Sequence, residues 1–118
     1  MTLFKFADKI VFNILADINV GYLEIINFQG EVLRLGNPQD YLKAKLKIIK
    51  PNFSFNLIKG GSVGFAESYM RGEFETDNLS NLIEITARNI KIIYKFSGLL
   101  DLPIVNFLKN LFIKNTKN

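Results

Sequence analysis

The stretch "LKAKLKII", residues 42–49, decides the fold, because its apolar and charged residues alternate without interruption. A period of two is typical of a β-strand that buries one face and exposes the other. The pattern predicts a buried row of Leu42, Ala44, Leu46 and Ile48 and an exposed row of Lys43, Lys45 and Lys47. The exposed row concentrates positive charge on one face of the predicted sheet.

The chain before this strand predicts a helix and a hairpin. Apolar residues recur at helical spacing over residues 3–18, which predicts an amphipathic helix. "YLEIINF" (22–28) and "EVLRL" (31–35) are separated by a Gln-Gly pair, which predicts two strands joined by a tight turn. A Gly-Asn-Pro sequence at 36–38 predicts the next turn, so we expect the three strands to form an antiparallel meander.

The chain after this strand predicts two short helices and a further strand. Residues 52–61 predict a helix closed by Gly60 or Gly61. A second helix is expected to follow and to end at Gly72, because glycine tolerates the left-handed conformation of a helix terminus. "EFET", residues 73–76, then predicts a short strand.

Two more helices complete the predicted fold. Residues 79–90 place apolar side chains at helical spacing after Asp77 or Asn78, either of which can cap the helix. A last helix is predicted to begin near Asp101 and Pro103. We therefore expect an α+β fold, with an antiparallel sheet of about four to five strands, an N-terminal helix, crossover helices and a C-terminal helix.

Length and composition limit the chemistry that the chain can perform. Its 118 residues suit a single domain, with residues 1–97 globular and residues 98–118 forming a C-terminal helix or linker. The sequence contains no cysteine and no histidine, which excludes thiolate chemistry and removes the usual neutral-pH base. No run approaches the roughly 18 apolar residues of a membrane span. We expect a cytoplasmic protein that is not an enzyme and holds no metal or cofactor.

The glycine-rich stretch "GGSVGFAESYMRGEFET", residues 60–76, raises the question of a phosphate-binding loop. A P-loop requires lysine and a hydroxyl residue directly after its last glycine, whereas Phe65 follows Gly64 here. We expect instead that Gly64 lets two backbone segments approach closely. Glu73 and Glu75 alternate around an apolar residue and are expected to lie on a solvated strand face.

Part of this region resembles the N-terminal domain of cyclopropane-fatty-acyl-phospholipid synthases. In that family two glycines, an aromatic residue and a glutamate precede a Tyr-Met pair, and a leucine-rich helix ending near Arg-Asn follows. The matching residues here are Gly61, Val63, Gly64, Phe65, Glu67, Tyr69, Met70, Gly72, Asp77, Leu79, Leu82, Arg88 and Asn89. "GYLEIINFQGEVLRLGN", residues 21–37, is similar to the first hairpin of the family.

The resemblance implies a lipid-binding role, and the order of elements also resembles that of sterol carrier protein type 2. Members of the synthase family continue into a methyltransferase domain that binds S-adenosylmethionine. The methyl-donor loop and the catalytic residues of that domain have no counterparts in this sequence. The resemblance therefore implies no catalytic residue here, and it implies a methyltransferase domain or subunit as a partner.

We therefore expect a non-catalytic domain that binds phospholipid or fatty-acyl chains and presents them to a methyltransferase domain. Lys43, Lys45 and Lys47 are the candidates for attracting the headgroups of an anionic membrane at its inner face. The candidate apolar wall for the acyl chain consists of Phe53, Phe55, Leu57, Phe65, Tyr69 and Met70. Each set also has a plainer interpretation: the wall residues could be ordinary core, and the lysines could be an ordinary solvated face.

Two functions of other classes remain as alternatives at the level of the sequence. The chain could be a protein-interaction or homodimerisation module that uses the apolar C-terminal helix. It could also be a basic nucleic-acid binder, although Arg34, Arg71 and Arg88 are its only arginines and no recognisable nucleic-acid module is present. We therefore expect no nucleic-acid partner.

Overall fold

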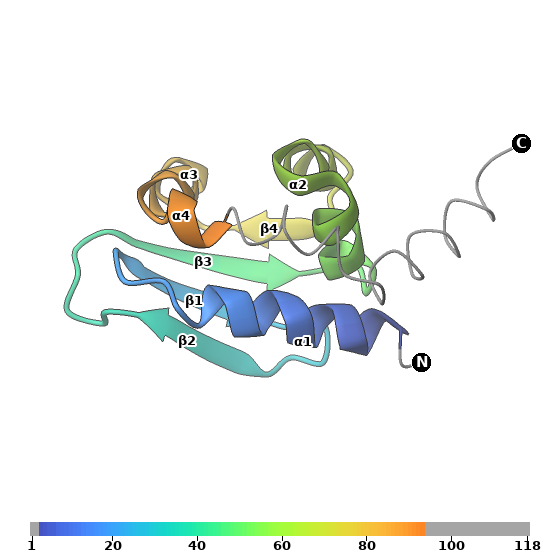
Figure 1. The fold of residues 1–118 in the computed structure, drawn as a ribbon, viewed down its shortest axis with the longest axis horizontal. Coiled ribbons are helices and arrows are strands. Elements are labelled where there is room, and N and C mark those ends of the chain that lie inside the picture. The colour runs from blue at the N-terminus through green and yellow to red at the C-terminus, as the bar shows by residue number, and fades with distance from the viewer. Residues whose placement is uncertain (1–2, 94–118) are drawn as a thin grey trace, which may run out of the picture.

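A computed structural model of the chain describes residues 3–93, and within that range it has four strands and four helices (Figure 1). The elements in chain order are α1 (Leu3–Leu15), β1 (Tyr22–Ile26), β2 (Val32–Gly36), β3 (Lys43–Ile48), α2 (Phe53–Met70), β4 (Phe74–Thr76), α3 (Leu79–Arg88) and α4 (Ile90–Ile93). The expected α+β class is confirmed. The predicted C-terminal helix and linker, residues 98–118, lie outside the described residues.

The sheet is mixed, with the strand order β2-β1-β3-β4. The predicted hairpin is confirmed, because β1 and β2 pair antiparallel with Tyr22 opposite Gly36. The predicted antiparallel meander is wrong, because β3 pairs with β1 in parallel, with Tyr22 opposite Lys43. The short strand β4 completes the sheet antiparallel to β3.

The parallel pairing arises because the connection from β2 to β3 passes over the first residue of β1, Tyr22. The backbone N–H of Asn37 donates to the carbonyl of Gly21 at 2.9 Å. The Asp40 carboxylate then accepts from the N–H groups of Gly21 at 2.8 Å and Leu42 at 2.9 Å. These two backbone hydrogen bonds lower the pKa of Asp40 below its usual value. A short connection over the end of β1 therefore replaces a second hairpin.

The helices cover one face of the sheet, and the main core lies between the two layers (Figure 1). In β3 the alternation is as predicted, since Ala44, Leu46 and Ile48 are buried and the three lysines are exposed. Ile25 of β1 and Phe74 of β4 are buried in the same core as these residues. A second, smaller cluster of Ala7, Val11, Phe55 and Ile58 joins α1 to α2.

Helix α2 contains the sharp bend that its glycines predict. Gly61 adopts φ 58° and ψ −136°, which no residue with a side chain adopts readily, so the helix divides into two halves there. Gly72, with φ 71°, follows the end of the second half, again as predicted. The two predicted short helices are therefore confirmed as the two halves of a single bent element.

Asn78 and Asn89 bound helix α3. The Asn78 side chain caps its first turn by accepting from the N–H of Asn81 at 2.9 Å. Asn89 follows its last residue and is almost completely buried. Among the helices that the structure describes, none combines the length and the apolar character that crossing a bilayer requires.

Candidate functional site

Among residues 3–93, no helix covers the face of the sheet opposite the helical layer (Figure 1), and we call it the open face. Lys43, Lys45 and Lys47 all project from it, one every second residue along the central strand β3. The candidate headgroup residues are therefore brought together as one row. The other side chains of the open face are Tyr22, Glu24, Ile26, Val32, Arg34 and Glu75.

Glu24 lies beside this row, and its charge is offset by other neighbours. It stands opposite Arg34 in the sheet, with the Nε atom of Arg34 3.7 Å from its carboxylate. The Tyr22 hydroxyl also donates to Glu24 at 3.1 Å. Burial and this hydrogen bond raise the pKa of Tyr22, so the phenol stays protonated at neutral pH. The Glu24 carboxylate is therefore engaged in an ion pair with Arg34 and a hydrogen bond with Tyr22.

Lys45 and Lys47 keep their positive charge free for a partner. Among the described residues, no carboxylate lies within ion-pair distance of either ammonium group. Asp77 approaches Lys45 but accepts from its backbone N–H, at 2.8 Å. The Lys43 ammonium lies 5.7 Å from the centre of the Tyr22 ring, within the range of a cation–π contact. The open face thus carries Lys43, Lys45, Lys47 and Arg34 against Glu24 and Glu75, which leaves a net positive charge.

Three residues of the candidate apolar wall lie around one buried ring of β4. Phe53, Phe65 and Tyr69 surround the ring of Phe74, with ring centres 5.2, 4.9 and 5.6 Å from it. Phe74 is only 1% exposed, and Phe53 and Phe65 pack with it between α2 and β4, whereas Tyr69 is 43% exposed. Aromatic pairs at such distances stabilise a core beyond the area that they bury.

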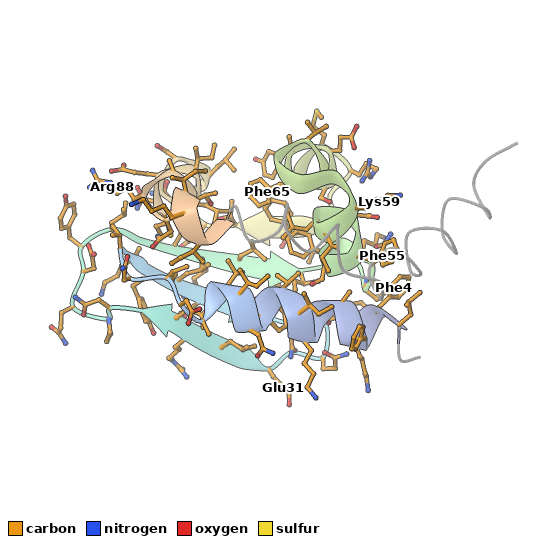
Figure 2. All side chains as sticks on the ribbon, viewed as in Figure 1. Phe4, Glu31, Phe55, Lys59, Phe65 and Arg88 are labelled. Carbon is orange, nitrogen blue, oxygen red and sulfur yellow. The ribbon has the colours of Figure 1, made fainter. Side chains whose placement is uncertain are left out.

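The other three wall candidates lie elsewhere on α2. Phe55 contacts the ring of Phe4 edge-on, with ring centres 6.4 Å apart, in the cluster that joins α1 to α2 (Figure 2). Leu57 is partly buried against both core clusters. Met70 is 76% exposed at the end of α2. The six wall candidates are therefore divided between two cores and the surface.

The two candidate sets also lie on opposite sides of the sheet. The lysine row is on the open face, whereas Phe53 and Phe65 are packed in the helical layer behind the sheet. The alternation of β3 itself imposes this separation, because neighbouring residues of a strand point to opposite faces. An acyl chain among the wall residues would therefore be separated from a headgroup at the lysines.

Glu73 is a buried charged group that the sequence pattern did not predict. Its carboxylate accepts from the Ser68 hydroxyl at 2.6 Å, the Asn56 amide at 3.0 Å and the Arg71 guanidinium at 2.8 Å. Burial alone raises the pKa of Glu73, but the three donors together lower it below its usual value. The expectation that Glu73 is solvated is wrong; Glu75 alone is exposed. The network joins both halves of α2 to β4.

A groove of about 600 Å³ runs between α1 and the turn that joins β1 to β2. No sequence pattern indicates this groove, because its two walls are far apart in the chain. Asn27 and Glu31 close the turn through three hydrogen bonds of 2.8–2.9 Å between backbone and side-chain atoms. The groove is lined by Lys5, Phe6, Asp8, Lys9, Phe12, Asn27, Gln29 and Glu31.

No three acidic side chains gather closely enough to hold a metal ion in the part of the chain that the structure describes. Comparison of the chain with protein-family models, with curated proteins and with solved structures returns no match. The open face and the groove are the surfaces of the described residues whose chemistry points to a function.

Proposed function

We propose that this chain is a non-catalytic lipid-binding domain that docks on anionic phospholipid surfaces through the open face of its sheet. The observation that carries this proposal is the row of three exposed lysines on β3, of which Lys45 and Lys47 have no acidic partner within ion-pair distance. Each lysine near an anionic membrane contributes about 1 kcal/mol of binding free energy. The three lysines project from the same face of one strand, so their ammonium groups can meet the headgroups together.

In this proposal the domain is a peripheral protein of the inner membrane face. There it brings phospholipid acyl chains to a methyltransferase domain or subunit that carries the catalytic groups. The resemblance of residues 61–89 to the N-terminal domain of the cyclopropane synthases supports this second part. The packing of Phe53 and Phe65 against Phe74 argues that the acyl chain is held somewhere other than at α2.

Co-sedimentation with vesicles tests the docking. The protein should bind vesicles that contain phosphatidylglycerol and should bind pure phosphatidylcholine vesicles less. Binding should weaken as salt is raised, because exposed charges are screened over about 10 Å at 0.1 M ionic strength. The variant K45Q/K47Q should bind more weakly, whereas Lys59→Gln, which removes one exposed lysine from α2, should bind as the wild type does. Equal binding to both kinds of vesicle at low salt would reject the proposal.

A protein-interaction role is the second candidate, and exposed apolar side chains on the helical layer favour it. Val63 and Met70 on α2 are 65% and 76% exposed, and Ile83 on α3 is 53% exposed. Exposed apolar side chains that gather on one surface mark interaction sites in many proteins. Sedimentation velocity over a range of concentrations tests self-association: a dimer that Met70→Lys converts to a monomer would support this role.

A further inference from the structure

The groove between α1 and the β1–β2 turn combines two free cations with an aromatic wall. Lys5 and Lys9 lie one helical turn apart, so their side chains project from the same side of α1. Both are exposed, and no described carboxylate lies within ion-pair distance of either one. Two neighbouring ammonium groups that form no ion pair can both contact an anionic headgroup.

Two acidic residues, Asp8 and Glu31, line the same groove, and neither forms an ion pair with these lysines. The Glu31 carboxylate accepts from the side-chain amide of Asn27 at 2.9 Å, as part of the closed turn. Figure 2 shows Glu31 on the side of α1 that faces away from α2. One oxygen of Asp8 is buried without a hydrogen bond, and burial raises the pKa of this carboxyl, an effect that the neighbouring Ser54 hydroxyl partly offsets.

Phe6 and Phe12 give the groove an apolar side. Phe6 is 37% exposed, and Phe12 is partly buried against both core clusters. Both residues line the groove, although they lie six positions apart along α1. The volume of about 600 Å³ lies within the range of small-molecule sites, about 300–1,000 Å³.

We propose that this groove binds a single anionic amphiphile, with its carboxylate or phosphate at Lys5 and Lys9 and its acyl chain along Phe6 and Phe12. The proposal deepens the lipid-binding function and rests on it for the class of ligand. It places the acyl chain at α1 rather than at α2, where Phe53 and Phe65 pack against Phe74. It needs no contact between the open face and a membrane.

Titration of the whole chain with dodecanoate below its micelle concentration, followed by amide NMR shifts, tests the site. The largest shifts should fall on residues 5–12 and 27–31. Dodecyl phosphate should give the same pattern, whereas inorganic phosphate and dodecanol should each bind at least about tenfold more weakly, because each lacks one half of the recognised group. These arms separate an acyl lipid from a free anion.

Two matched double variants distinguish this proposal from membrane docking. K5Q/K9Q should raise the dissociation constant for dodecanoate about tenfold, since it removes charge-assisted contacts to the headgroup. K45Q/K47Q removes the same charge from the open face and should leave dodecanoate binding unchanged while weakening binding to anionic vesicles. Phe6→Ser should weaken binding of the long chain but not of acetate, with the helix content checked by circular dichroism.

Three results would overturn the assignment of the groove. They are an equal loss of dodecanoate binding in the two lysine variants, shifts centred on α2, or dodecanol binding as tightly as dodecanoate. If the wild type binds dodecanoate in the groove but does not bind anionic vesicles, the docking function is rejected and the groove assignment is retained.

Discussion

Gly64 packs so closely against Asn56 that a Cβ atom on Gly64 would lie 2.5 Å from the Asn56 carbonyl oxygen. In a straight helix these residues would be about 12 Å apart along the axis, at 1.5 Å per residue. The contact exists because the chain turns at Gly61 and folds the second half of α2 back against the first. The Asn56 side chain also donates to Glu73, so the bend and the buried carboxylate share one residue.

The first prediction concerns this contact. Gly64→Ala should lower the free energy of unfolding by about 1–3 kcal/mol, because the new methyl group overlaps a backbone oxygen that cannot rotate away. The loss should appear even though alanine is favoured over glycine in a helix by about 1 kcal/mol. Urea denaturation of the wild type and the variant gives the difference.

Gly60 provides the matched control. It lies in the same helix, and nothing stands within 4 Å of the place where its Cβ would be. Gly60→Ala should therefore keep or slightly raise the stability of the fold, through helix propensity alone. If Gly64→Ala is as stable as Gly60→Ala, the close approach of the two halves is wrong.

The second prediction concerns Asn89, which ties the end of α3 to the loop before β1. Its side-chain oxygen accepts from the N–H groups of Asn19 at 3.0 Å and Val20 at 3.3 Å. Its amide donates to the carbonyls of Val20 at 2.9 Å and Ile85 at 2.7 Å. Asn89→Ala should cost at least about 2 kcal/mol, because it leaves several of these groups without partners.

Thermal or urea denaturation measures this cost, and Asn13→Ala is the control. Asn13 is exposed on α1, so its replacement should change the stability by no more than about 0.5 kcal/mol. A similar small change for Asn89→Ala would mean that water replaces its hydrogen bonds and that the connection is not structural.

The third prediction is a pH dependence that arises from Glu73. Its folded-state pKa lies below the ordinary value of 4.5, so its ionised form contributes stability at neutral pH. That contribution is complete above the unfolded-state pKa and is lost as the pH falls through the lower folded-state pKa. The unfolding free energy of the wild type should therefore decrease as the pH is lowered below about 4.5.

Urea denaturation at a series of pH values between neutral and 3 measures this effect. Glu73→Gln should decrease less over the same acidic range, because glutamine has no proton to gain. Glu75→Gln should follow the wild type, since Glu75 is exposed. Parallel pH curves for the wild type and Glu73→Gln would show that the buried carboxylate does not link folding to protons.

The local elements could be predicted because their signals are local. The alternation of β3, the turn between β1 and β2, and the positive φ of Gly61 and Gly72 depend on residues within a few positions of one another. The direction of β3 relative to β1 could not be predicted in this way. A strand alternates identically beside a parallel or an antiparallel neighbour, so the short crossing held by Asp40 decided the pairing.

The candidate site could be predicted only in part, for the same reason. Alternation was enough to place the three lysines on one exposed face. Burial of Glu73 depends on donors from both halves of a bent helix, which no strand pattern reveals. The groove depends on the packing of α1 beside residues 27–31, and apolar spacing alone could not distinguish a pocket wall from the core around Phe74.

The central claim is that the open face of the sheet meets the membrane, and two matched valines test it most directly. The sequence has no cysteine, so Val32→Cys and Val63→Cys each provide one labelling position. Val32 is 43% exposed on the open face, and Val63 is 65% exposed on the helical layer. With an environment-sensitive fluorophore and phosphatidylglycerol vesicles, the emission should shift to the blue at position 32 and stay unchanged at position 63. A shift at position 63 without one at position 32 would contradict the account.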